Sequence, residues 1–319
     1  MTVVATWTEI APALRGIDLL RAIEDGFAAL HRGDATVPPV GELLFPRGEA
    51  HIKYGAIRGD DTFAVKVATG FYDNPRKGLP SSNGVMLLFD AATGTPRAVL
   101  LDEGRLTDIR TAVAGAVAAK YLAPKNIEAI GVIGTGIQAR LQVEYLRRVT
   151  HCDRVFVHGR SAEAMDAYRS DMADKAFDVT PCATVSDVAA HANLIVTTTP
   201  SHSPLLMAGD IRPGTHITAV GADTAEKNEI DPAIFAKADH VVADSLPQCA
   251  TRGELHHALA AGAIGEARIV ELGAIVAGAA KGRQTAEEIT VADLTGVAVQ
   301  DIRIAQAVLA AIEAKRQAA

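Results

Sequence analysis

The N-terminal part of the chain shows two different spacings of apolar side chains. From Ile17 to Leu30, apolar residues recur at steps of three and four, which is the period of an amphipathic helix. Short β-rich segments follow, separated by Gly, Pro, Asn or Asp, at residues 51–57, 63–68, 85–89 and 97–101. We therefore predict a helix followed by a mixed or antiparallel sheet.

A different pattern begins after an alanine-rich tract at residues 111–121, which predicts a helix that ends before Pro124. Beyond it, helical segments alternate with apolar strands at residues 129–133, 154–158, 194–198, 217–220 and 240–243. That alternation predicts a parallel, doubly wound sheet of the Rossmann type. A final helix over residues 297–314 has no strand after it, and we expect it to return to the first domain.

The length of 319 residues favours two domains, because a single core stops growing at about 250 to 300 residues. We predict an α/β protein with an α+β domain at residues 1–118 and 299–319. The second domain, at residues 119–298, would be the Rossmann-type one.

Composition narrows the possible partners. A net charge of -7 without a basic stripe argues against nucleic acid as a partner. The most apolar stretch, residues 269–280, is shorter than the roughly 20 residues that span a bilayer, and the N-terminus lacks a signal-peptide pattern. Three cysteines without a Cys-x-x-Cys pair suit a reducing compartment. We expect a cytoplasmic protein without membrane partners.

A glycine-rich turn follows the first strand of the second domain. The strand Ile130-Gly-Val-Ile133 leads directly into Gly134-Thr135-Gly136-Ile137-Gln138-Ala139 and then a helix. Gly134 would permit the tight turn, Gly136 the approach of a pyrophosphate, and Ala139 close packing of the helix. The helix N-terminus would offer N–H groups to the phosphates. We predict a dinucleotide site; the alternative is a turn whose glycines serve packing alone.

The end of the second strand bears on the choice between NAD and NADP. An acid about 20 residues after the glycines would bind the ribose hydroxyls of NAD, but the chain has His158-Gly159-Arg160-Ser161 there. Arg160 with Ser161 would suit the 2′-phosphate of NADP. Alternatively, Arg160 stacks on adenine and serves either cofactor.

Seven ordered blocks together resemble the ornithine cyclodeaminase/mu-crystallin family over most of the chain. They are FAVKV at 63–67, GLPS at 78–81, LTDIRTA at 106–112, GTGIQA at 134–139, VTTTP at 196–200, VGAD at 220–223 and LTGVA at 294–298. The resemblance implies a homodimeric enzyme that uses NAD(P) to interconvert small amino acids and imines. It also implies that the first domain binds substrate and dimerises, whereas the second binds the dinucleotide.

Three further segments are most similar to the iminosuccinate reductase and ectoine-utilisation branches: FYDNP at 71–75, KNEI at 227–230 and GELHH at 253–257. This resemblance implies reduction of iminosuccinate to L-aspartate, and it decides our choice of NAD, with NADP possible. Many members have Pro-Pro-Arg near the first helix, whose Arg grips the substrate carboxylate, but this chain reads Pro38-Pro39-Val40. Lys53 or Arg47 would then supply the missing cation.

Two basic residues are candidates for the chemistry of imine reduction. Lys66 lies between Val65 and Val67 on a predicted central strand, where desolvation would lower the pKa of its ammonium and suit it to proton donation. The alternative is an edge lysine that reaches solvent. The resemblance implies that Arg110 contacts the substrate carboxylate and the cofactor; an interdomain ion pair is the alternative.

Asp223 would end a strand at the carboxyl edge, where open α/β sheets bind ligands. There it would orient the imine nitrogen or Lys66; alternatively, it caps a helix before Glu226. Ser81 would hydrogen-bond substrate or nicotinamide. Thr198 and Thr199 would contact the cofactor, although strand-end threonines also commonly cap backbone amides. The resemblance adds cofactor contacts at Val220, Gly221, Ala222, Thr295 and Gly296.

We predict no metal site, because His256 and His257 are adjacent on a helix and face about 100° apart. Two other functions stay open. One is an ornithine cyclodeaminase-like enzyme that releases ammonia and recycles NAD internally. The other is a crystallin-like protein that binds the cofactor or another ligand without turnover.

Overall fold

The computed structural model describes residues 2–71 and 73–318 and divides into two compact units. Unit 1 takes the chain up to Arg110 and from Val297 onward, and unit 2 is Thr111–Gly296. Helix α3 (Arg105–Leu122) crosses the first border. Our sequence-based borders lay at residues 118/119 and 298/299. Tyr72, part of the FYDNP segment quoted above, lies outside the described residues.

Unit 1 is built on a mixed sheet of strand order β1-β7-β6-β5-β4-β2, with β3 paired to β4. All its pairs are antiparallel except β1 with β7. The strands are β1 Val3–Thr6, β2 Ala35–Thr36, β3 Gly41–Phe45, β4 Gly48–Ile57, β5 Thr62–Gly70, β6 Ser82–Asp90 and β7 Pro96–Leu101. The helices are α1 Trp7–Leu14, α2 Leu19–His31, the 3-10 turn η1 Asn74–Lys77 and α11 Ala298–Gln317. The expected helix and four strands are present, and α1, β1, β2 and β3 are additional.

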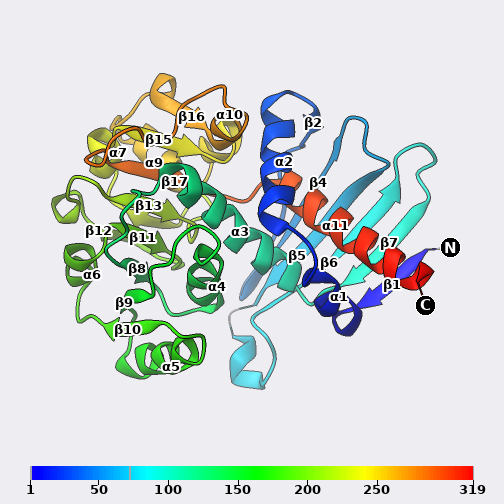
Figure 1. Ribbon diagram of the computed structural model, residues 1–319, viewed down its shortest axis with the longest axis horizontal. Helices are drawn as coiled ribbons and strands as arrows, with labels where there is room; N and C mark the ends of the chain where they lie inside the picture. Colours follow the sequence, from blue (N-terminus) through cyan, green and yellow to red (C-terminus); the bar gives the residue numbers. More distant parts are fainter. Residues whose placement is uncertain (1, 72, 319) are drawn as a thin grey trace. The chain divides into compact units, whose positions relative to one another are not determined.

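The long helix α11 runs across the strands of this sheet and packs on β4, β5 and β6, with α2 beside it (Figure 1). Alternation along β5 explains the packing: Thr62, Ala64 and Lys66 are buried, whereas the residues between them are only partly covered. A strand presents successive side chains to opposite faces. The face that carries Lys66 therefore belongs to the interior of unit 1.

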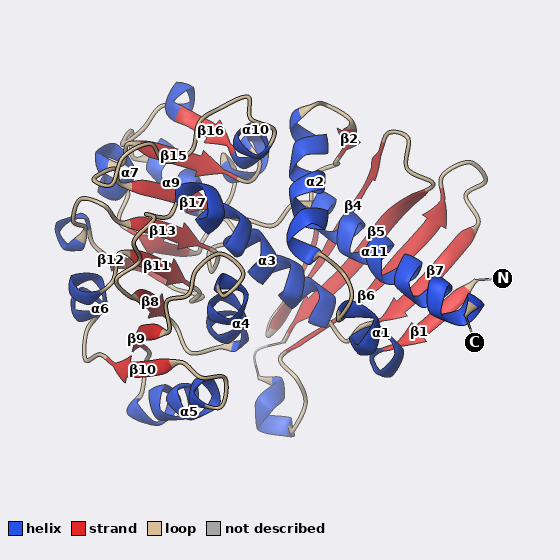
Figure 2. Cartoon of the chain, viewed as in Figure 1, coloured by secondary structure: helices blue, strands red, loops and turns tan. Residues whose placement is uncertain are grey.

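Unit 2 contains an eight-stranded parallel sheet of order β10-β9-β8-β11-β13-β17-β15-β16 (Figure 2). Its strands are β8 Ile130–Ile133, β9 Arg154–His158, β10 Asp178–Pro181, β11 Leu194–Thr197, β13 His216–Ala219, β15 His240–Ala243, β16 Ile269–Glu271 and β17 Thr290–Asp293. Two more, β12 His202–Leu206 and β14 Asn228–Ile230, pair separately. The other elements are α4 Ile137–Leu146, α5 Ala162–Ala173, α6 Val185–His191, η2 Ala208–Asp210, α7 Ala233–Lys237, α8 Leu246–Cys249, α9 Glu254–Ala260, η3 Glu266–Arg268 and α10 Leu272–Val276.

This order confirms the predicted α/β class with a doubly wound parallel sheet. The chain runs outward from β8 to β10, then returns to β11 on the other side of β8 and continues in the opposite direction. The reversal between β8 and β11 is a topological switch point, where folds of this type bind ligands at the carboxyl ends of the strands. The ends of β8 and β11 are therefore the first place to look for a site.

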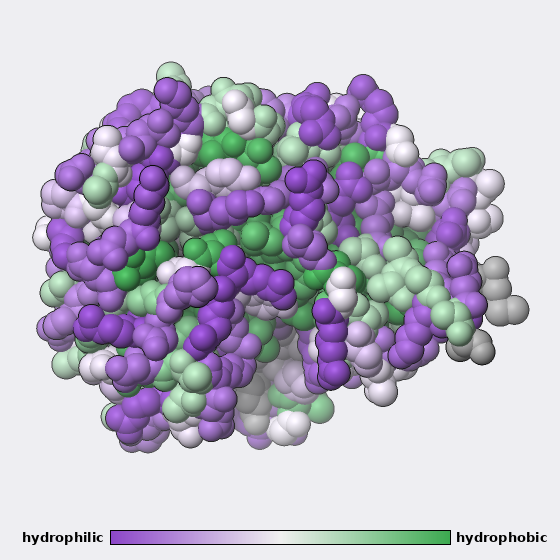
Figure 3. All heavy atoms as spheres, in the orientation of Figure 1, coloured by the Kyte–Doolittle hydropathy of each residue, from purple (hydrophilic) through white to green (hydrophobic). Residues whose placement is uncertain are grey.

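Two placements differ from the sequence prediction. Arg110 lies inside α3, which begins at Arg105, because the helix extends one and a half turns ahead of the alanine-rich tract. Thr198 follows β11 and is not part of it. Among the residues described, no helix combines the length and apolarity needed to cross a membrane, and hydrophilic residues predominate over unit 2 on the face shown in Figure 3.

Candidate functional site

The glycine-rich turn leaves the carboxyl end of β8 at the switch point. Gly134 has a φ of +119°, and a Cβ there would lie only 2.4 Å from Oγ1 of Thr198, so the position requires glycine. Gly136 precedes α4 with open space around its Cα. Thr135, Ile137 and Gln138 complete the turn, and none of the three is buried. The turn has the room and the free helix N-terminus that a pyrophosphate needs.

Arg140 fixes the orientation of this turn, and sequence reasoning missed it. Its Nη1 donates to the carbonyl oxygens of Thr135 and Gly136, and its Nε lies 2.8 Å from Oδ2 of Asp171 on α5. The N–H of Gly134 donates to the carbonyl oxygen of His158 at 2.9 Å. Because Arg140 holds the carbonyl groups of Thr135 and Gly136, the N–H groups at the N-terminus of α4 are left for an anion. The only local signal was a basic residue directly after the fingerprint.

Beyond β9, the residues expected at the adenosine end are accessible. The ring of His158 is fixed by a 3.1 Å contact between its Nδ1 and the carbonyl oxygen of Cys182. Gly159 follows, and the side chain of Arg160 is exposed. Oγ of Ser161 accepts a hydrogen bond from the backbone N–H of Ala164 and caps α5. The Ser161 hydroxyl also hydrogen-bonds the carboxylate of Glu163, and the guanidinium of Arg160 is the exposed group at this end.

The loops after β11 and β13 lie side by side at the same edge. Oγ1 of Thr198 donates to the carbonyl oxygen of Ile133, which ties this loop to β8. Thr199 uses both its N–H and its hydroxyl on the buried carboxylate of Glu229. Val220 and Ala222 are buried and Gly221 is partly covered. The hydroxyl groups of Thr198 and Thr199 are thus used for hydrogen bonds within unit 2, and the backbone of the two loops forms the edge that a ligand would reach.

Asp223 continues the loop after β13. Its carboxylate accepts a 2.7 Å hydrogen bond from Nζ of Lys227. The residues after it form bends that lead into β14, so the alternative prediction of a helix cap before Glu226 is wrong. The ion pair orients the carboxylate.

Thr295 and Gly296 follow β17 and are both buried. The hydroxyl of Thr295 donates to Oδ1 of Asp244 at 3.0 Å, and the backbone N–H of Gly296 donates to Oδ2 at 2.6 Å. Asp244 directly follows β15, so it joins the loops of two neighbouring strands. Sequence reasoning named Thr295 and Gly296 but not the acid that holds them.

Unit 1 brings three cations to one buried carboxylate. Lys53 on β4 and Lys66 on β5 are directly opposite each other and are only 6% and 2% exposed. Like charges at opposed positions destabilise a sheet, so this pair requires an anion. Asp301 of α11 supplies it, with Oδ2 lying 3.7 Å from Nζ of Lys66. Because β5 lies between β4 and β6, the alternative of an edge lysine is wrong.

Arg110 completes this cluster from α3. Its Nε donates to Oδ1 of Asp301 at 2.8 Å, and its Nη1 donates to Oε1 of Gln300 at 2.7 Å. Both partners belong to unit 1, so these contacts are not interdomain ion pairs. Burial alone would raise the pKa of Asp301, but the charges of Arg110, Lys66 and Lys53 hold that pKa below its ordinary value. Asp301 is therefore ionised at neutral pH.

The other two candidates of unit 1 lie away from this cluster. Arg47 pairs with Asp73 at 3.2 Å, and its side chain is 76% exposed. The carbonyl oxygen of Ser81 accepts from the backbone N–H of Phe71, which is five residues beyond Lys66. Five residues of strand span about 17 Å. Of the cations considered as replacements for the missing arginine, Lys53 has the buried position.

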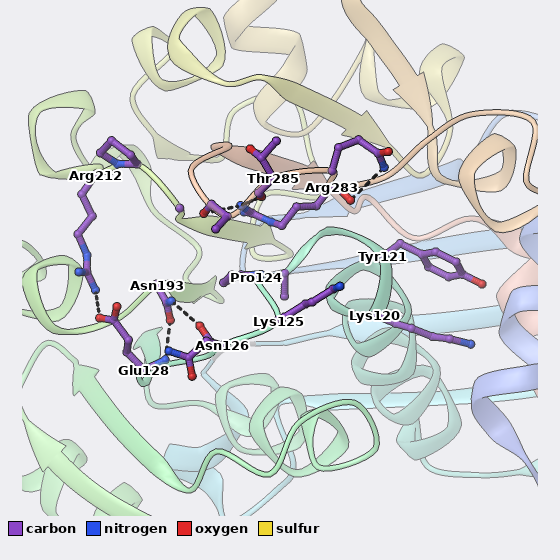
Figure 4. Close-up of a pocket in the computed structure, with 15 residues that line it drawn as sticks. Lys120, Tyr121, Pro124, Lys125, Asn126, Glu128, Asn193, Arg212, Arg283 and Thr285 are labelled. Atoms are coloured by element: carbon purple, nitrogen blue, oxygen red, sulfur yellow. Dashed lines mark hydrogen bonds and ion pairs between the residues drawn. The ribbon is translucent and has the colours of Figure 1, made fainter.

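A cavity of about 540 Å³ lies at the opposite, amino edge of the unit 2 sheet (Figure 4). Arg212 pairs there with Glu128, at a distance from Lys120 and Lys125. Arg283 donates to surrounding carbonyl groups, including those of Leu122 and Thr215. These cations do not converge on one point. Parallel sheets bind ligands at their carboxyl ends, so we assign the nucleotide to the Gly134 edge and not to this cavity.

The rings of His256 and His257 both contact backbone carbonyl oxygens. Their ring nitrogens lie 3.1 Å from the oxygen of Ala250 and 2.9 Å from that of Lys227. Within residues 2–71 and 73–318, no group of three acidic, His or Cys side chains is placed to hold a metal ion.

Comparison with known proteins covers nearly the whole chain. The sequence profile of the ornithine cyclodeaminase/mu-crystallin family matches residues 1–316. A putative dehydrogenase of Rhizobium meliloti is 44% identical over 301 residues, 92% of this chain and 91% of that protein. The iminosuccinate reductase of Paracoccus denitrificans is 37% identical over 309 residues, 94% of this chain and 93% of that protein.

Three solved structures superimpose on nearly the whole of this chain. An archaeal alanine dehydrogenase dimer with bound NAD superimposes with a TM-score of 0.91 at 33% identity, over 99% of this chain and 97% of that one. The Δ1-pyrroline-2-carboxylate reductase of Thermococcus litoralis, in complex with NADH and L-proline, gives 0.93 at 27% identity, over 99% and 98%. The P. denitrificans iminosuccinate reductase in complex with NAD+ gives 0.88 at 33% identity, over 99% and 97%.

Proposed function

This chain belongs to the ornithine cyclodeaminase/mu-crystallin family, and on that premise we propose that it is an NADH-dependent imine reductase that converts iminosuccinate to L-aspartate. The predicted family is confirmed by the match to residues 1–316. The observation that carries the proposed substrate is the set of three buried cations, Lys53, Lys66 and Arg110, whose charges act on the carboxylate of Asp301.

The chemistry of that set suits a substrate with two carboxylates. Ammonium and guanidinium groups form charge-assisted hydrogen bonds with carboxylates, and Lys53 on β4 and Arg110 on α3 supply one such group each. We assign the α-carboxylate to Arg110, whose forked guanidinium matches a carboxylate, and the second carboxylate to Lys53.

Lys66 is the proposed proton donor. Reduction of the imine forms a C–H bond at carbon and requires a proton at nitrogen, so the C=N double bond becomes a C–N single bond. When bound, NADH would supply the hydride. Nζ of Lys66 would supply the proton, and the contact with Asp301 would hold its ammonium in place. We propose that Asp223 orients the imine nitrogen, with its own carboxylate held by Lys227.

The residues proposed to bind the cofactor belong to unit 2. Gly136 and the N-terminus of α4 would take the pyrophosphate, Gly134 permits the turn that leads to them, and Arg140 holds the carbonyl groups of that turn. We propose that Gly159, Arg160 and Ser161 face the adenosine ribose and that the loops after β11, β13 and β17 hold the rest. Relatives crystallised with NAD+ or NADH support NADH as the reductant; Arg160 leaves room for NADPH as a second cofactor.

We also propose a homodimer formed through unit 1. Strand β3 exposes Leu43, Leu44 and Phe45, the largest run of exposed apolar side chains among the described residues, and Tyr54 on β4 is exposed as well. Such apolar patches on a folded protein commonly mark interfaces. The archaeal alanine dehydrogenase is a dimer. Sedimentation equilibrium should give twice the chain mass.

The cytoplasmic location stays a prediction from the three cysteines.

The reaction is tested directly by mixing the protein with oxaloacetate, ammonia and NADH. We expect loss of NADH absorbance with formation of aspartate. Pyruvate with ammonia tests reduction to alanine, and ornithine with catalytic NAD and an ammonia assay tests the cyclodeaminase. NADH binding without turnover of any of these would favour the non-catalytic, crystallin-like alternative.

A further inference from the structure

Glu229 sits behind the cofactor edge of unit 2 and is fully buried. Its two carboxylate oxygens accept four hydrogen bonds from two different loops. Oε2 accepts from Oγ1 of Thr197 at 2.8 Å and from the backbone N–H of Gly221 at 2.9 Å. Oε1 accepts from the backbone N–H of Thr199 and, at 2.7 Å, from its Oγ1. One side chain therefore joins the ends of β11 and β13.

The loops meet so closely that no other side chain fits between them. A Cβ on Gly221 would lie 2.3 Å from the carbonyl oxygen of Thr199 and 2.4 Å from Oε2 of Glu229. The carboxylate occupies two backbone N–H groups at the ends of neighbouring parallel strands, where an anionic ligand would otherwise be attracted. The phosphates are thereby directed to the Gly134 turn.

Glu229 is itself held in place by a second buried acid. Oε1 of Glu254 accepts the backbone N–H of Glu229 at 2.7 Å, and its Oε2 accepts the N–H of Ile230 at 3.1 Å. The short strand β14 is thus fixed against α9. A side chain whose backbone is anchored in this way holds its partners with little freedom.

We propose that Glu229 is a positioning residue for the dinucleotide, which fastens the loops after β11 and β13 in the conformation that binds NADH. The inference rests on the proposed function, because it takes these loops as part of the cofactor site. Glu229 does not touch the reacting atoms; it acts through Thr199 and Gly221.

The test is the Kd of NADH at pH 8, above the pKa of about 7 of Glu229, measured by the fluorescence of the bound dihydronicotinamide well below the melting temperature. Glu229→Gln keeps the shape but turns one acceptor oxygen into a donor that faces other donors, and should raise the Kd about tenfold or more. Thr197→Val removes one of the four bonds and should raise it roughly threefold. Thr290→Val is the control: it removes a buried hydroxyl that bonds Leu122 and His216 at the amino edge of the same sheet.

Thr290→Val should lower the melting temperature without changing the Kd. An unchanged Kd in folded Glu229→Gln would overturn the proposal, as would an equal rise in Thr290→Val at equal loss of stability. If Glu229→Gln does not fold, Thr197→Val decides by the same criterion. Wild-type protein that binds NADH but reduces no imine would refute the proposed function and leave this result standing, whereas wild-type protein that binds no NADH refutes both.

Discussion

Nε of Arg110 lies 2.8 Å from Oδ1 of Asp301, although 191 positions separate the two residues. Both side chains are buried, and a buried ion pair is strongly destabilised when one partner is removed. The final helix therefore does more than cover the sheet of unit 1. It brings a buried carboxylate into contact with both Lys66 and Arg110.

Asp301→Asn tests this role of the final helix. Loss of the charge takes from Lys66 and Arg110 the buried carboxylate that both contact, and should lower the free energy of unfolding of unit 1 by roughly 3 kcal/mol. Trp7, the single tryptophan, lies in α1 of unit 1 and reports that transition by fluorescence during urea unfolding. Asp60→Asn is the control: Asp60, in the turn between β4 and β5, accepts from Arg303 of the same helix α11 at 2.8 Å but is partly exposed, and its loss should cost about 1 kcal/mol or less. Equal losses in the two variants would contradict the assignment.

Lys66→Ala should lower kcat and leave NADH binding intact. A positioned general acid contributes about 100- to 10,000-fold to rate, and Lys66 belongs to unit 1, whereas the nucleotide turn belongs to unit 2. The comparison is steady-state kcat against the NADH Kd from fluorescence. Full turnover in a variant that still binds NADH would remove Lys66 as the proton donor.

Lys53→Met separates a dicarboxylate substrate from a monocarboxylate one. If Lys53 binds the second carboxylate, KM for the oxaloacetate and ammonia reaction should rise about tenfold or more, while the pyruvate and ammonia reaction changes little. Met keeps the apolar stem on β4 and removes only the charge. A parallel rise for both substrates would assign Lys53 to the shared α-carboxylate instead.

Local motifs predicted much of this molecule from sequence. The turn at Gly134 and the strands β8, β9 and β15 were predicted from short-range patterns, because residues close together in the sequence determine both a turn and the burial of a strand. Short strands such as β14 and β16 were missed, since three residues carry too little periodicity. β3 was missed because its apolar residues are exposed.

The partners of the site residues could not be predicted in the same way. Lys66 and Thr199 were named from local sequence and Arg110 from the family resemblance, but Asp301 and Glu229 are brought to them only by the packing of distant elements. The remaining signal was an acid inside an apolar segment: Asp301 interrupts the apolar start of α11, and Glu229 lies in the buried strand β14. A buried acid requires a partner, although the pattern does not say which.

Arg160→Asp tests the selection between the two cofactors. The exposed guanidinium after β9 would attract the 2′-phosphate of NADPH, and a carboxylate there would repel it and bind ribose hydroxyls. We expect the Kd of NADPH to rise about a hundredfold relative to that of NADH. Arg169→Asp, on the exposed side of α5 where Arg169 pairs with Asp166, controls for net charge. An unchanged ratio would mean that Arg160 only stacks on adenine.

The buried acids of unit 2 predict an unusual dependence of stability on pH. Burial raises the pKa of Glu229 to about 7 and that of Asp293 to about 8, from ordinary values of 4.5 and 3.8. Between those limits the folded chain retains protons that the unfolded chain has released. The free energy of unfolding should therefore fall as the pH rises, by about 1.4 kcal/mol per pH unit for each proton retained.

Glu229→Gln removes one of these protons, so between pH 5 and 7 its free energy of unfolding should fall less steeply, by about 1.4 kcal/mol per pH unit. Asp301→Asn provides the contrast: the pKa of Asp301 is lowered, so the stability it contributes is present above its ordinary value of 3.8 and is lost only at lower pH. Its slope between pH 5 and 7 should match that of the wild type. Urea unfolding followed by circular dichroism at pH 5, 6 and 7 measures both slopes. A wild-type slope in Glu229→Gln would mean that Glu229 is ionised throughout this range, because its four hydrogen bonds outweigh the cost of burial.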